Sequence, residues 1–387
     1  MKLNSHNEWS ALREVVLGTV EGFIPPLEFP NVQEKIVAVA NSLVAKAYPR
    51  WYLEEVAEDL ANLESVFQSF GIKILRPSWQ ENSANFSGPN WAAQGYDIYN
   101  VRDLHIVFGD TLIVSASASR FRFFEHYALQ NIFYNHYMPE GIRWIYAPPP
   151  CLRGEYVEEY QRPWTALEES EDERHTALSG GLSETFHRLA ENEILFDAAN
   201  IIRIGEDVLY LVSSTGNRLA GKWLQSVLGS HYRVHITDLY RSSHLDSTIL
   251  PLKPGSVLLN SNRVGSENYP KIFQKWDKLF FGDVVPVPEN EIKFHQDVRL
   301  PVFRELKAMG VNSALEHISS PWAGLNVLSI NPETILVHDL QLPLIRFLEG
   351  RGFNVIPIRM RHLYSMMGGL HCSTLDTVRE GSLEDYR

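Results

Sequence analysis

The strongest candidate for chemistry is Cys372, which ends the run Gly368-Gly369-Leu370-His371-Cys372. A thiolate becomes a good nucleophile when a nearby cation or backbone dipoles lower the thiol pKa. A histidine such as His244 can carry a proton, and a carboxylate can orient that histidine. The two glycines would let backbone amides approach closely. The sequence therefore predicts an enzyme with a cysteine nucleophile.

Other polar residues occupy equivalent places along the chain. Each lies at or just before the first strand of a repeated unit, and the set is Asp103, Asp197, the pair His244 and Asp246, Asn326 and Cys372. Taken singly, Asp197 could cap a turn, Asp103 could form a surface ion pair, and His244 could be a satisfied core histidine. Cys372 alone could be a small buried residue. Their shared placement favours one site, in which further carboxylates would suit a planar guanidinium.

The elements that must position this set form a repeated unit of strand, tight turn, strand, helix and strand. Apolar runs and turn residues predict four copies, which begin near residues 103, 197, 246 and 326. The predicted strands are 104–108, 111–114 and 144–146, then 201–204, 208–212 and 232–239, then 248–252, 257–260 and 278–285, and finally 327–330, 334–337 and 353–358. The predicted helices are 121–137, 218–228, 269–276 and 342–348.

A fifth unit can be assembled from the two ends of the chain. It would take a strand at 14–18, a helix at 54–70 and a strand at 72–75, with the missing strand supplied after Cys372. Because joining the ends removes a free sheet edge, five such units predict a closed ring. The alternative is a general α/β sandwich whose hairpins are similar by chance. Insertions near 148–190 and 286–319 exclude a solenoid, and a single domain over 1–387 is expected.

Composition limits the classes of function. The chain has 387 residues, 44% of them hydrophobic, which is ample for a large core, and its formal net charge of -12 argues against a nucleic-acid partner. The two cysteines, Cys151 and Cys372, form no disulfide framework and suggest a reducing compartment. Because a signal segment and a membrane-length apolar run are both missing from the sequence, a cytosolic protein without a membrane partner is expected. The sequence also lacks a CxxC pair, a Walker loop and a Rossmann fingerprint, so no metal site is predicted.

Several motifs in order resemble the arginine:amidinotransferases, including the glycine and inosamine-phosphate amidinotransferases, of the guanidino-group-modifying superfamily. The resemblance covers nearly the whole chain and implies the pentein fold, an α/β propeller of five pseudo-symmetric ββαβ blades. Its carriers are NVRD at 100–103, SRFRFFE at 119–125, FDAAN at 196–200, YRVHI at 232–236, HLDST at 244–248, NSNR at 260–263, SSPW at 319–322 and GGLHC at 368–372. Such a series is far more specific than any one motif.

The resemblance implies catalytic roles for three residues. Cys372 would attack the guanidino carbon of L-arginine and carry the amidino group as a covalent intermediate. His244 would protonate the departing ornithine and then deprotonate an incoming amine, while Asp197 would orient His244. The kinetics would be ping-pong.

The resemblance also implies how substrate is held. Asp103 and Asp246 would bind the guanidinium of arginine, and Arg263 would bind its carboxylate together with Ser319 and Ser320. It further implies that no cofactor is needed and that the enzyme is a homodimer. The expected partners are therefore L-arginine, an acceptor amine and a second copy of the chain.

Two departures from the glycine-using members concern the acceptor. This chain has Asn200 where they have Asp, and Arg241-Ser242-Ser243 where they have Asn-Pro-Met. Ser243 is smaller than the methionine it replaces and should open room, so Arg241 and Ser243 are predicted to line a pocket for an amine bulkier than glycine. The chain looks like the cyanobacterial toxin-pathway amidinotransferases, and the saxitoxin type, which uses an amino-ketone acceptor, is favoured over the cylindrospermopsin type.

Three alternatives remain open at this stage, and a fourth is set aside. Glycine could still be the acceptor, or water could replace the amine, as in an arginine deiminase, with citrulline as product. A member of another class would be a non-catalytic arginine-binding protein. A papain-like hydrolase fits poorly, because its cysteine precedes its histidine along the chain. Cys151 has no assigned role, and the acidic run 168–173 is interpreted as a solvated loop.

Overall fold

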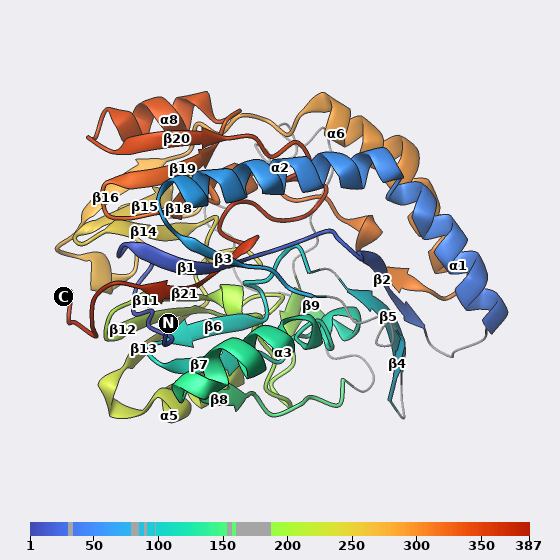
Figure 1. The fold of residues 1–387 in the computed structure, drawn as a ribbon, viewed down its shortest axis with the longest axis horizontal. Helices are drawn as coiled ribbons and strands as arrows, with labels where there is room; N and C mark the ends of the chain where they lie inside the picture. The colour runs from blue at the N-terminus through green and yellow to red at the C-terminus, as the bar shows by residue number, and fades with distance from the viewer. Residues whose placement is uncertain (30–33, 79–84, 89–90, 97, 153–156, 160–186) are drawn as a thin grey trace.

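The computed structural model describes residues 1–29, 34–78, 85–88, 91–96, 98–152, 157–159 and 187–387 (Figure 1). Both chain ends contribute to the same part of the fold, because Arg379 N donates to Asn4 O and Asn4 forms a β-bridge to Val378. No helix in these described ranges has the length and apolar character that crossing a membrane requires.

Four copies of the predicted unit are present as three-stranded sheets (Figure 1). In each sheet the first two strands pair antiparallel and the third runs parallel to the second. The strands are β6 (His105–Phe108), β7 (Thr111–Val114) and β8 (Arg143–Tyr146); β11 (Ile201–Ile204), β12 (Asp207–Leu211) and β13 (Arg233–Thr237); β14 (Ile249–Lys253), β15 (Ser256–Asn260) and β16 (Asp277–Phe281); and β18 (Leu328–Ser329), β19 (Thr334–His338) and β20 (Asn354–Ile358).

The fifth unit is built from both ends of the chain, as predicted. Strand β21 (Thr374–Arg379) pairs antiparallel with β1 (Leu12–Leu17), and β1 pairs parallel with β3 (Lys73–Leu75). Helix α2 (Arg50–Ser69) leads into β3 within this unit and lies across the molecule in Figure 1. The strand expected after Cys372 is therefore confirmed, and it begins two residues beyond the cysteine.

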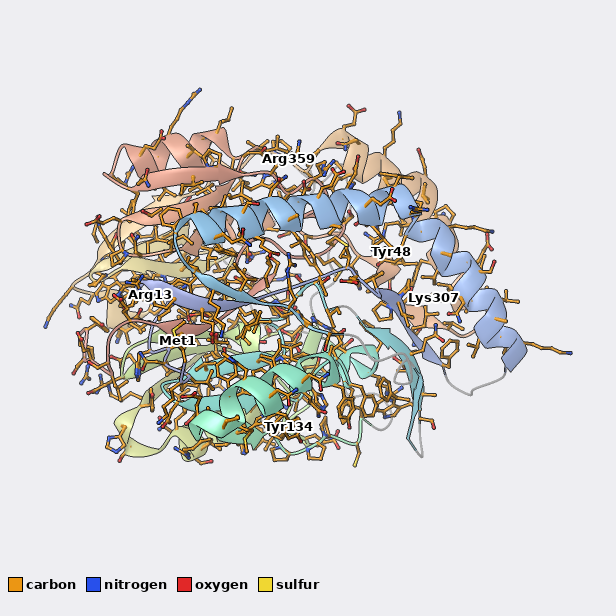
Figure 2. The ribbon with its side chains drawn as sticks, viewed as in Figure 1. Met1, Arg13, Tyr48, Tyr134, Lys307 and Arg359 are labelled. Atoms are coloured by element: carbon orange, nitrogen blue, oxygen red, sulfur yellow. The ribbon has the colours of Figure 1, made fainter. Side chains whose placement is uncertain are left out.

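The five sheets pack against one another in a closed cycle. Successive residues of one strand point to opposite sides, so Ile201 and Ile202 enter different cores. Figure 2 shows side chains filling the space between the sheets. The shared cores join the first sheet to the second (Ile106, Val208), the second to the third and fourth (Leu209, Leu258, Ile335), the fourth to the fifth (Leu336, Val15), and the fifth to the first (Val16, Val107). This cycle is what the predicted ring requires, and it explains why entire strands are buried.

Of the four helices predicted in the complete units, two are correct and two need revision. Helix α5 (Arg218–Leu228) has the predicted bounds, with Asn217 as N-cap and Gly229 at its end, and α8 (Leu342–Glu349) is one residue longer than expected. The helix expected at 121–137 is divided into η1 (Arg120–Arg122), α3 (Tyr127–Ile132), the π-helix η2 (Phe133–Tyr137) and, beyond it, η3 (Met138–Glu140).

The helix expected at 269–276 is wrong. Only one 3-10 turn, η6 (Lys271–Phe273), forms between Pro270 and the start of β16. Proline lacks a backbone donor, and Asp277 N already donates to Gly255 O in the turn between β14 and β15 of the same sheet, so too few residues remain for a helix.

A side layer that the sequence interpretation missed lies beyond the five sheets, on the right of Figure 1. Its four-stranded sheet has the order β17-β2-β5-β4. Its elements are β2 (Ile24–Phe29), α1 (Glu34–Ala47), β4 (Asn85–Ser87), β5 (Ala92–Tyr96), α6 (Glu289–Phe294), the π-helix η7 (His295–Arg299), α7 (Leu300–Ala308), β17 (Asn312–Ser313) and η8 (Ala314–Glu316). Leu27, Val44 and Leu306 belong to its separate core. The segment 286–319 is thus part of a structured layer.

The other predicted insertion, 148–190, is described only in part. Strand β9 (Val157–Glu159) pairs with β10 (His187–Leu189). The acidic run 168–173 lies outside the described residues. Cys151 is exposed.

Candidate active site

The sulfur of Cys372 lies where three of the five units meet. Its side chain is buried, and Sγ donates to Asp246 Oδ2 at 3.2 Å. Asn326 Nδ2 donates to the same sulfur at 3.3 Å. Asp246 precedes β14, Asn326 ends the 3-10 segment η9 (Pro321–Leu325) before β18, and Cys372 precedes β21. The predicted convergence of strand starts is therefore confirmed for these three residues.

Gly368 and Gly369 allow two kinds of close approach. The backbone of Gly369 forms a hydrogen bond to Cys372, as the sequence predicts, and two side-chain amides lie against the glycines. A Cβ on Gly369 would lie 2.8 Å from Asn326 Oδ1, and a Cβ on Gly368 would overlap the amide of Asn100. The glycines thus let two side-chain amides lie against the chain that carries Cys372.

His244 and Asp197 form a second group. His244 Nε2 lies 3.1 Å from Asp197 Oδ2, and Nδ1 lies 3.8 Å from Asp103 Oδ1. Asp197 stands at the N-terminus of η4 (Ala198–Asn200), but its side chain makes no capping hydrogen bond, so the simple turn-cap explanation is wrong. Burial alone would lower the pKa of His244, but the charge of Asp103 and the hydrogen bond to Asp197 raise it to about 9. At neutral pH this histidine is therefore a proton donor.

Asp103 is also buried in the site. Arg122 Nη1 donates to Asp103 Oδ2 at 2.6 Å, and Arg122 pairs with Glu125 at 2.9 Å. Burial raises the pKa of Asp103 although His244 and Arg122 oppose this shift. The alternative of a surface ion pair with the neighbouring arginine is wrong, because Arg102 instead pairs with another carboxylate in the core.

The charges around Cys372 differ from the sequence expectation. That expectation places a cation or dipoles beside the thiol. The backbone hydrogen bond of Gly369 is such a dipole and lowers the pKa of the thiol, but the nearby charges of Asp246 and Asp103 are negative. Burial raises the pKa of the Cys372 thiol well above its ordinary value, and these two carboxylates raise it further. The resting cysteine is therefore a neutral thiol, and a cation bound between the carboxylates would favour the thiolate.

Asp246 is connected through His371 to a network of buried charged residues. His371 Nδ1 lies 2.9 Å from Asp246 Oδ2, and His371 Nε2 lies 3.2 Å from Glu8 Oε2. Arg203 pairs with Glu8 at 2.9 Å and with Asp376 at 2.6 Å. Although burial opposes it, the hydrogen bond from His371 lowers the pKa of Asp246 to about 2 and so keeps it ionised. Sequence reasoning missed this network, although His371 stands inside the GGLHC motif.

The predicted carboxylate-binding residues lie in two different segments. Arg263 is buried, and its Nη1 donates to Ser242 Oγ at 2.8 Å and to Thr248 Oγ1 at 3.0 Å, which places it beside the loop of His244. Ser319 N donates to Tyr364 O at 2.9 Å, and Ser320 is the N-cap of η9. The binding of a carboxylate by these residues stays a prediction.

The carbonyl of Ser243 holds the C-terminal end of the predicted acceptor segment, Arg241 to Ser243, in addition to the contact of Ser242 with Arg263. Ser243 O accepts hydrogen bonds from Ser213 Oγ at 2.7 Å, Thr215 Oγ1 at 2.8 Å and Asn200 Nδ2 at 3.1 Å. An aspartate in place of Asn200 would offer no such amide donor. The replacement of aspartate by Asn200 in this chain therefore adds a hydrogen bond to the segment that contains Arg241. The side chain of Arg241 is partly buried.

Replacing Asp197 by asparagine is expected to lower the pKa of His244 from about 9 by at least one unit, because a neutral amide no longer stabilises the protonated ring. The pKa can be followed by NMR of the imidazole protons. Asp238→Asn is the matched control, since Asp238 is an exposed carboxylate paired with Arg218. An unchanged His244 titration in Asp197→Asn would contradict this account.

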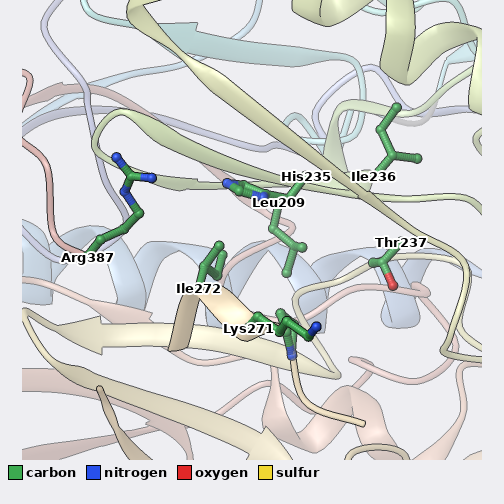
Figure 3. Close-up of a pocket in the computed structure, with 8 residues that line it drawn as sticks. Leu209, His235, Ile236, Thr237, Lys271, Ile272 and Arg387 are labelled. Carbon is green, nitrogen blue, oxygen red and sulfur yellow. The ribbon is translucent and has the colours of Figure 1, made fainter. Parts of the chain in front are cut away.

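A separate groove of about 330 Å³ lies between β13 and η6 and is lined by Leu209, His235, Ile236, Thr237, Lys271 and Ile272, among others (Figure 3). The residues lining it include none of the predicted site residues. The groove is therefore separate from the candidate site, which is identified by the contacts and charges of its residues.

Comparison with known proteins identifies relatives over the full chain, although no family model matches. Inosamine-phosphate amidinotransferase 1 of Streptomyces glaucescens is 37% identical over 391 residues, which cover 99% of this chain and 98% of that protein. The solved structure of inosamine-phosphate amidinotransferase StrB1 from Streptomyces griseus has a TM-score of 0.76 and 31% identity and covers 99% of both chains. SxtG, an amidinotransferase from Microseira wollei in the saxitoxin biosynthetic pathway, has a TM-score of 0.74 and 28% identity and covers 100% of this chain and 99% of that one.

These neighbours confirm the predicted pentein fold class. The identity and coverage of the Streptomyces glaucescens protein also confirm the predicted enzyme class. The chain belongs to the amidinotransferase family, enzymes that transfer amidino groups.

Proposed function

We propose that this enzyme transfers the amidino group of L-arginine to a primary amine of a specialised metabolite, with an amidino-Cys372 intermediate and release of ornithine. The observation that carries the proposal is the joint placement of a thiol and a protonated histidine among three carboxylates. Sγ of Cys372 lies 3.2 Å from Asp246, and His244 lies between Asp197 and Asp103. A guanidinium fits this arrangement, because its fork of donors can bind both Asp246 and Asp103.

The first half-reaction begins when the guanidinium of arginine binds. Its charge offsets Asp246 and Asp103, so the Cys372 thiol releases its proton to solvent. The thiolate attacks the guanidino carbon and forms an S–C bond. His244, protonated because its pKa is about 9, gives its proton to the departing nitrogen, and the C–N bond to ornithine breaks. The products are ornithine, neutral His244 and an amidino-cysteine.

The second half-reaction reverses these proton transfers. The neutral His244 takes a proton from the incoming amine as that amine attacks the amidino carbon. The S–C bond breaks, and the thiolate of Cys372 leaves. The acceptor departs as a guanidinium, the thiolate takes a proton back from solvent, and His244 is again protonated. Asp197 orients the histidine in both halves.

The proposed acceptor is an amine bulkier than glycine. Ser243 leaves more room than the methionine of the glycine-using members, and the amino-ketone of the saxitoxin type is the acceptor that the sequence favours. The full-length structural similarity to SxtG, which is named as a member of that pathway, supports this choice.

A second acceptor is favoured by a specific observation. The relative with 37% identity is named for inosamine phosphate, whereas SxtG shares 28%. An inosamine phosphate carries an anionic group, and the cationic Arg241 of the acceptor segment would attract an anion but repel a second guanidinium. The charge of Arg241 would thus favour binding of the inosamine phosphate over binding of the guanidino-bearing amino-ketone.

The proposal is tested by intact-protein mass spectrometry with arginine, followed by a panel of amines. We expect an amidino adduct on Cys372 that glycine discharges slowly and that either a guanidino-bearing amino-ketone or an inosamine phosphate discharges rapidly. Steady citrulline release from arginine alone would identify a hydrolase. Arginine binding without any adduct would identify a non-catalytic binding protein. Cys151→Ser should leave the adduct unchanged.

Four further expectations belong to the same proposal. The chemistry above uses only residues of the chain, so no cofactor is proposed. A homodimer is proposed from the family resemblance, and a cytosolic location from the two-cysteine composition. Arg263, Ser319 and Ser320 are proposed to hold the carboxylate of arginine.

A further inference from the structure

Asn326 is the residue of the fourth unit that occupies the same place as the proposed catalytic residues of the other units. The sequence places Asn326 among the polar residues at the strand starts, but the mechanism proposed above assigns it no role. Its side chain is buried, and both ends of its amide face the Cys372 loop. Such a fully buried amide is expected to have all its polar atoms used.

The amide nitrogen of Asn326 is directed at the reacting sulfur. Nδ2 donates to Cys372 Sγ at 3.3 Å, whereas the side-chain contact of the sulfur with Asp246 at 3.2 Å requires the thiol to be the donor. When the thiol loses its proton, the contact with Asp246 becomes repulsive and the contact with Asn326 becomes a charge-assisted hydrogen bond. Asn326 therefore favours the reactive form of the cysteine, and Asp246 favours the resting form.

The amide oxygen of Asn326 fixes the same loop. Oδ1 accepts from His371 N at 2.8 Å and from Cys372 N at 3.1 Å. Gly369 is required beside it, because a Cβ there would lie 2.8 Å from both Asn326 Cβ and Oδ1. The side-chain amide of Asn326 thus forms hydrogen bonds to the backbone through Oδ1 and to the sulfur through Nδ2. The bonds at Oδ1 fix the position of Nδ2 relative to the nucleophile.

Most of the other groups that face the sulfur act in the opposite direction. Burial disfavours a negative sulfur most strongly, Asp246 and Asp103 also disfavour it, and the backbone hydrogen bond of Gly369 favours it. His371 and His244 act on the carboxylate of Asp246. Among the side chains that the structure describes at the sulfur, Asn326 is the one that donates a hydrogen bond to it, and its amide carries no charge.

We propose that Asn326 is a catalytic residue, which stabilises the thiolate of Cys372 through its Nδ2 donor and holds the nucleophile loop through its Oδ1 acceptor. This inference rests on the proposed function in one respect, namely that Cys372 is the nucleophile. It does not depend on which amine is the acceptor, because the contact lies at the sulfur.

The test separates the two ends of the amide in a Cys151→Ser background, where Cys372 is the remaining thiol. Asn326→Asp keeps an oxygen that accepts from the two backbone amides but replaces the donor by a charged acceptor. Asn326→Ala removes both ends. Asn100→Ala is the matched control, because Asn100 is a buried amide that donates to Met366 O of the same loop and adjoins Gly368.

Iodoacetamide alkylation of Cys372 is measured against pH, with the ultraviolet absorbance of the thiolate as a reading that does not depend on access. At neutral pH, alkylation is expected to slow by about 10-fold in Asn326→Ala and by at least about 100-fold in Asn326→Asp, since one lost charge-assisted hydrogen bond corresponds to roughly a tenfold change and an added charge to more. The midpoint of the thiolate absorbance should move to higher pH in both variants. Asn100→Ala should change either quantity by less than about threefold.

Two results would overturn the inference: wild-type alkylation and absorbance midpoints in a folded Asn326→Asp, or equal slowing in Asn100→Ala, which would assign the effect to loop order. Circular dichroism and arginine binding establish that each variant is folded. Amidination of wild-type Cys372 by arginine is measured in parallel. If it fails, the proposed function fails while the alkylation series still reports on Asn326, so the two failures are distinguishable.

Discussion

Replacing Cys372 by serine is expected to lower kcat by at least about 10⁴-fold, because the serine hydroxyl is a far weaker acid and a poorer nucleophile than the thiol. The site amplifies this difference. Burial and the carboxylates of Asp246 and Asp103 already raise the pKa of the thiol, and they would keep a hydroxyl protonated throughout the accessible pH range. A bound guanidinium can offset those charges enough to ionise a thiol. It cannot lower the much higher pKa of an alcohol to the accessible pH range.

The measurement is ornithine release from arginine together with the acceptor, with intact mass to detect the adduct. Cys372→Ser should still bind arginine with a Kd within about threefold of the wild type, because the oxygen fits the same space and the carboxylates remain. Cys151→Ser is the control for loss of a thiol, since Cys151 is exposed. Substantial turnover in Cys372→Ser would show that another group is the nucleophile.

The sequence predicted the five-unit fold because its signals are local. Turns such as Gly109-Asp110 and Gly205-Glu206-Asp207 join strands whose apolar runs are continuous, and such runs are typical of strands buried on both faces. The strand after Cys372 was predicted from the need to close a ring, and β21 confirms it. The helix at 269–276 is wrong because Pro270 and the start of β16 leave room only for the 3-10 turn η6.

The side layer could not be predicted in the same way. β2 contains Pro25 and Pro26, which are unfavourable for a strand, and β4 and β17 are only three and two residues long. Their pairing depends on α1 and α7, which supply apolar side chains from opposite ends of the chain. A sheet assembled from such distant pieces leaves no periodic signal in any one of them.

The site was predictable in position but not in its charges. Register along the five units identifies Asp103, Asp197, His244, Asp246, Asn326 and Cys372, and contacts between them are present in the structure. Which charge faces which atom depends on side-chain directions that spacing does not give. The sequence predicts a cation or dipoles beside Cys372. The structure has dipoles there, at the Gly369 backbone and the Asn326 amide, but it has carboxylates in place of a cation. The support from Glu8 and Arg203 has no signal in the sequence.

This charge arrangement leads to an expectation for Asp246→Asn: a more reactive free thiol in a less active enzyme. Asp246 accepts from Cys372 Sγ at 3.2 Å, and of the two carboxylates that act on the thiol it contributes more to raising the pKa. Removing its charge lowers the pKa of the thiol towards its ordinary value, so the thiolate fraction at neutral pH rises about tenfold for each unit of pKa. Iodoacetamide alkylation of the free enzyme should therefore accelerate by about 10- to 100-fold.

Turnover should change in the opposite direction. The neutral amide removes one of the two proposed anchors of the guanidinium, and the loss of a buried charged partner is expected to lower kcat/KM for arginine by about 100- to 1,000-fold. Asp103→Asn is the matched comparison, because Asp103 affects the thiol by charge without a hydrogen bond to it, and its acceleration of alkylation should be smaller. Slower alkylation in Asp246→Asn would mean that Asp246 activates the resting thiol as a base. Faster alkylation together with lost turnover would mean that Asp246 restrains the thiol until a substrate cation arrives, which couples nucleophile activation to arginine binding.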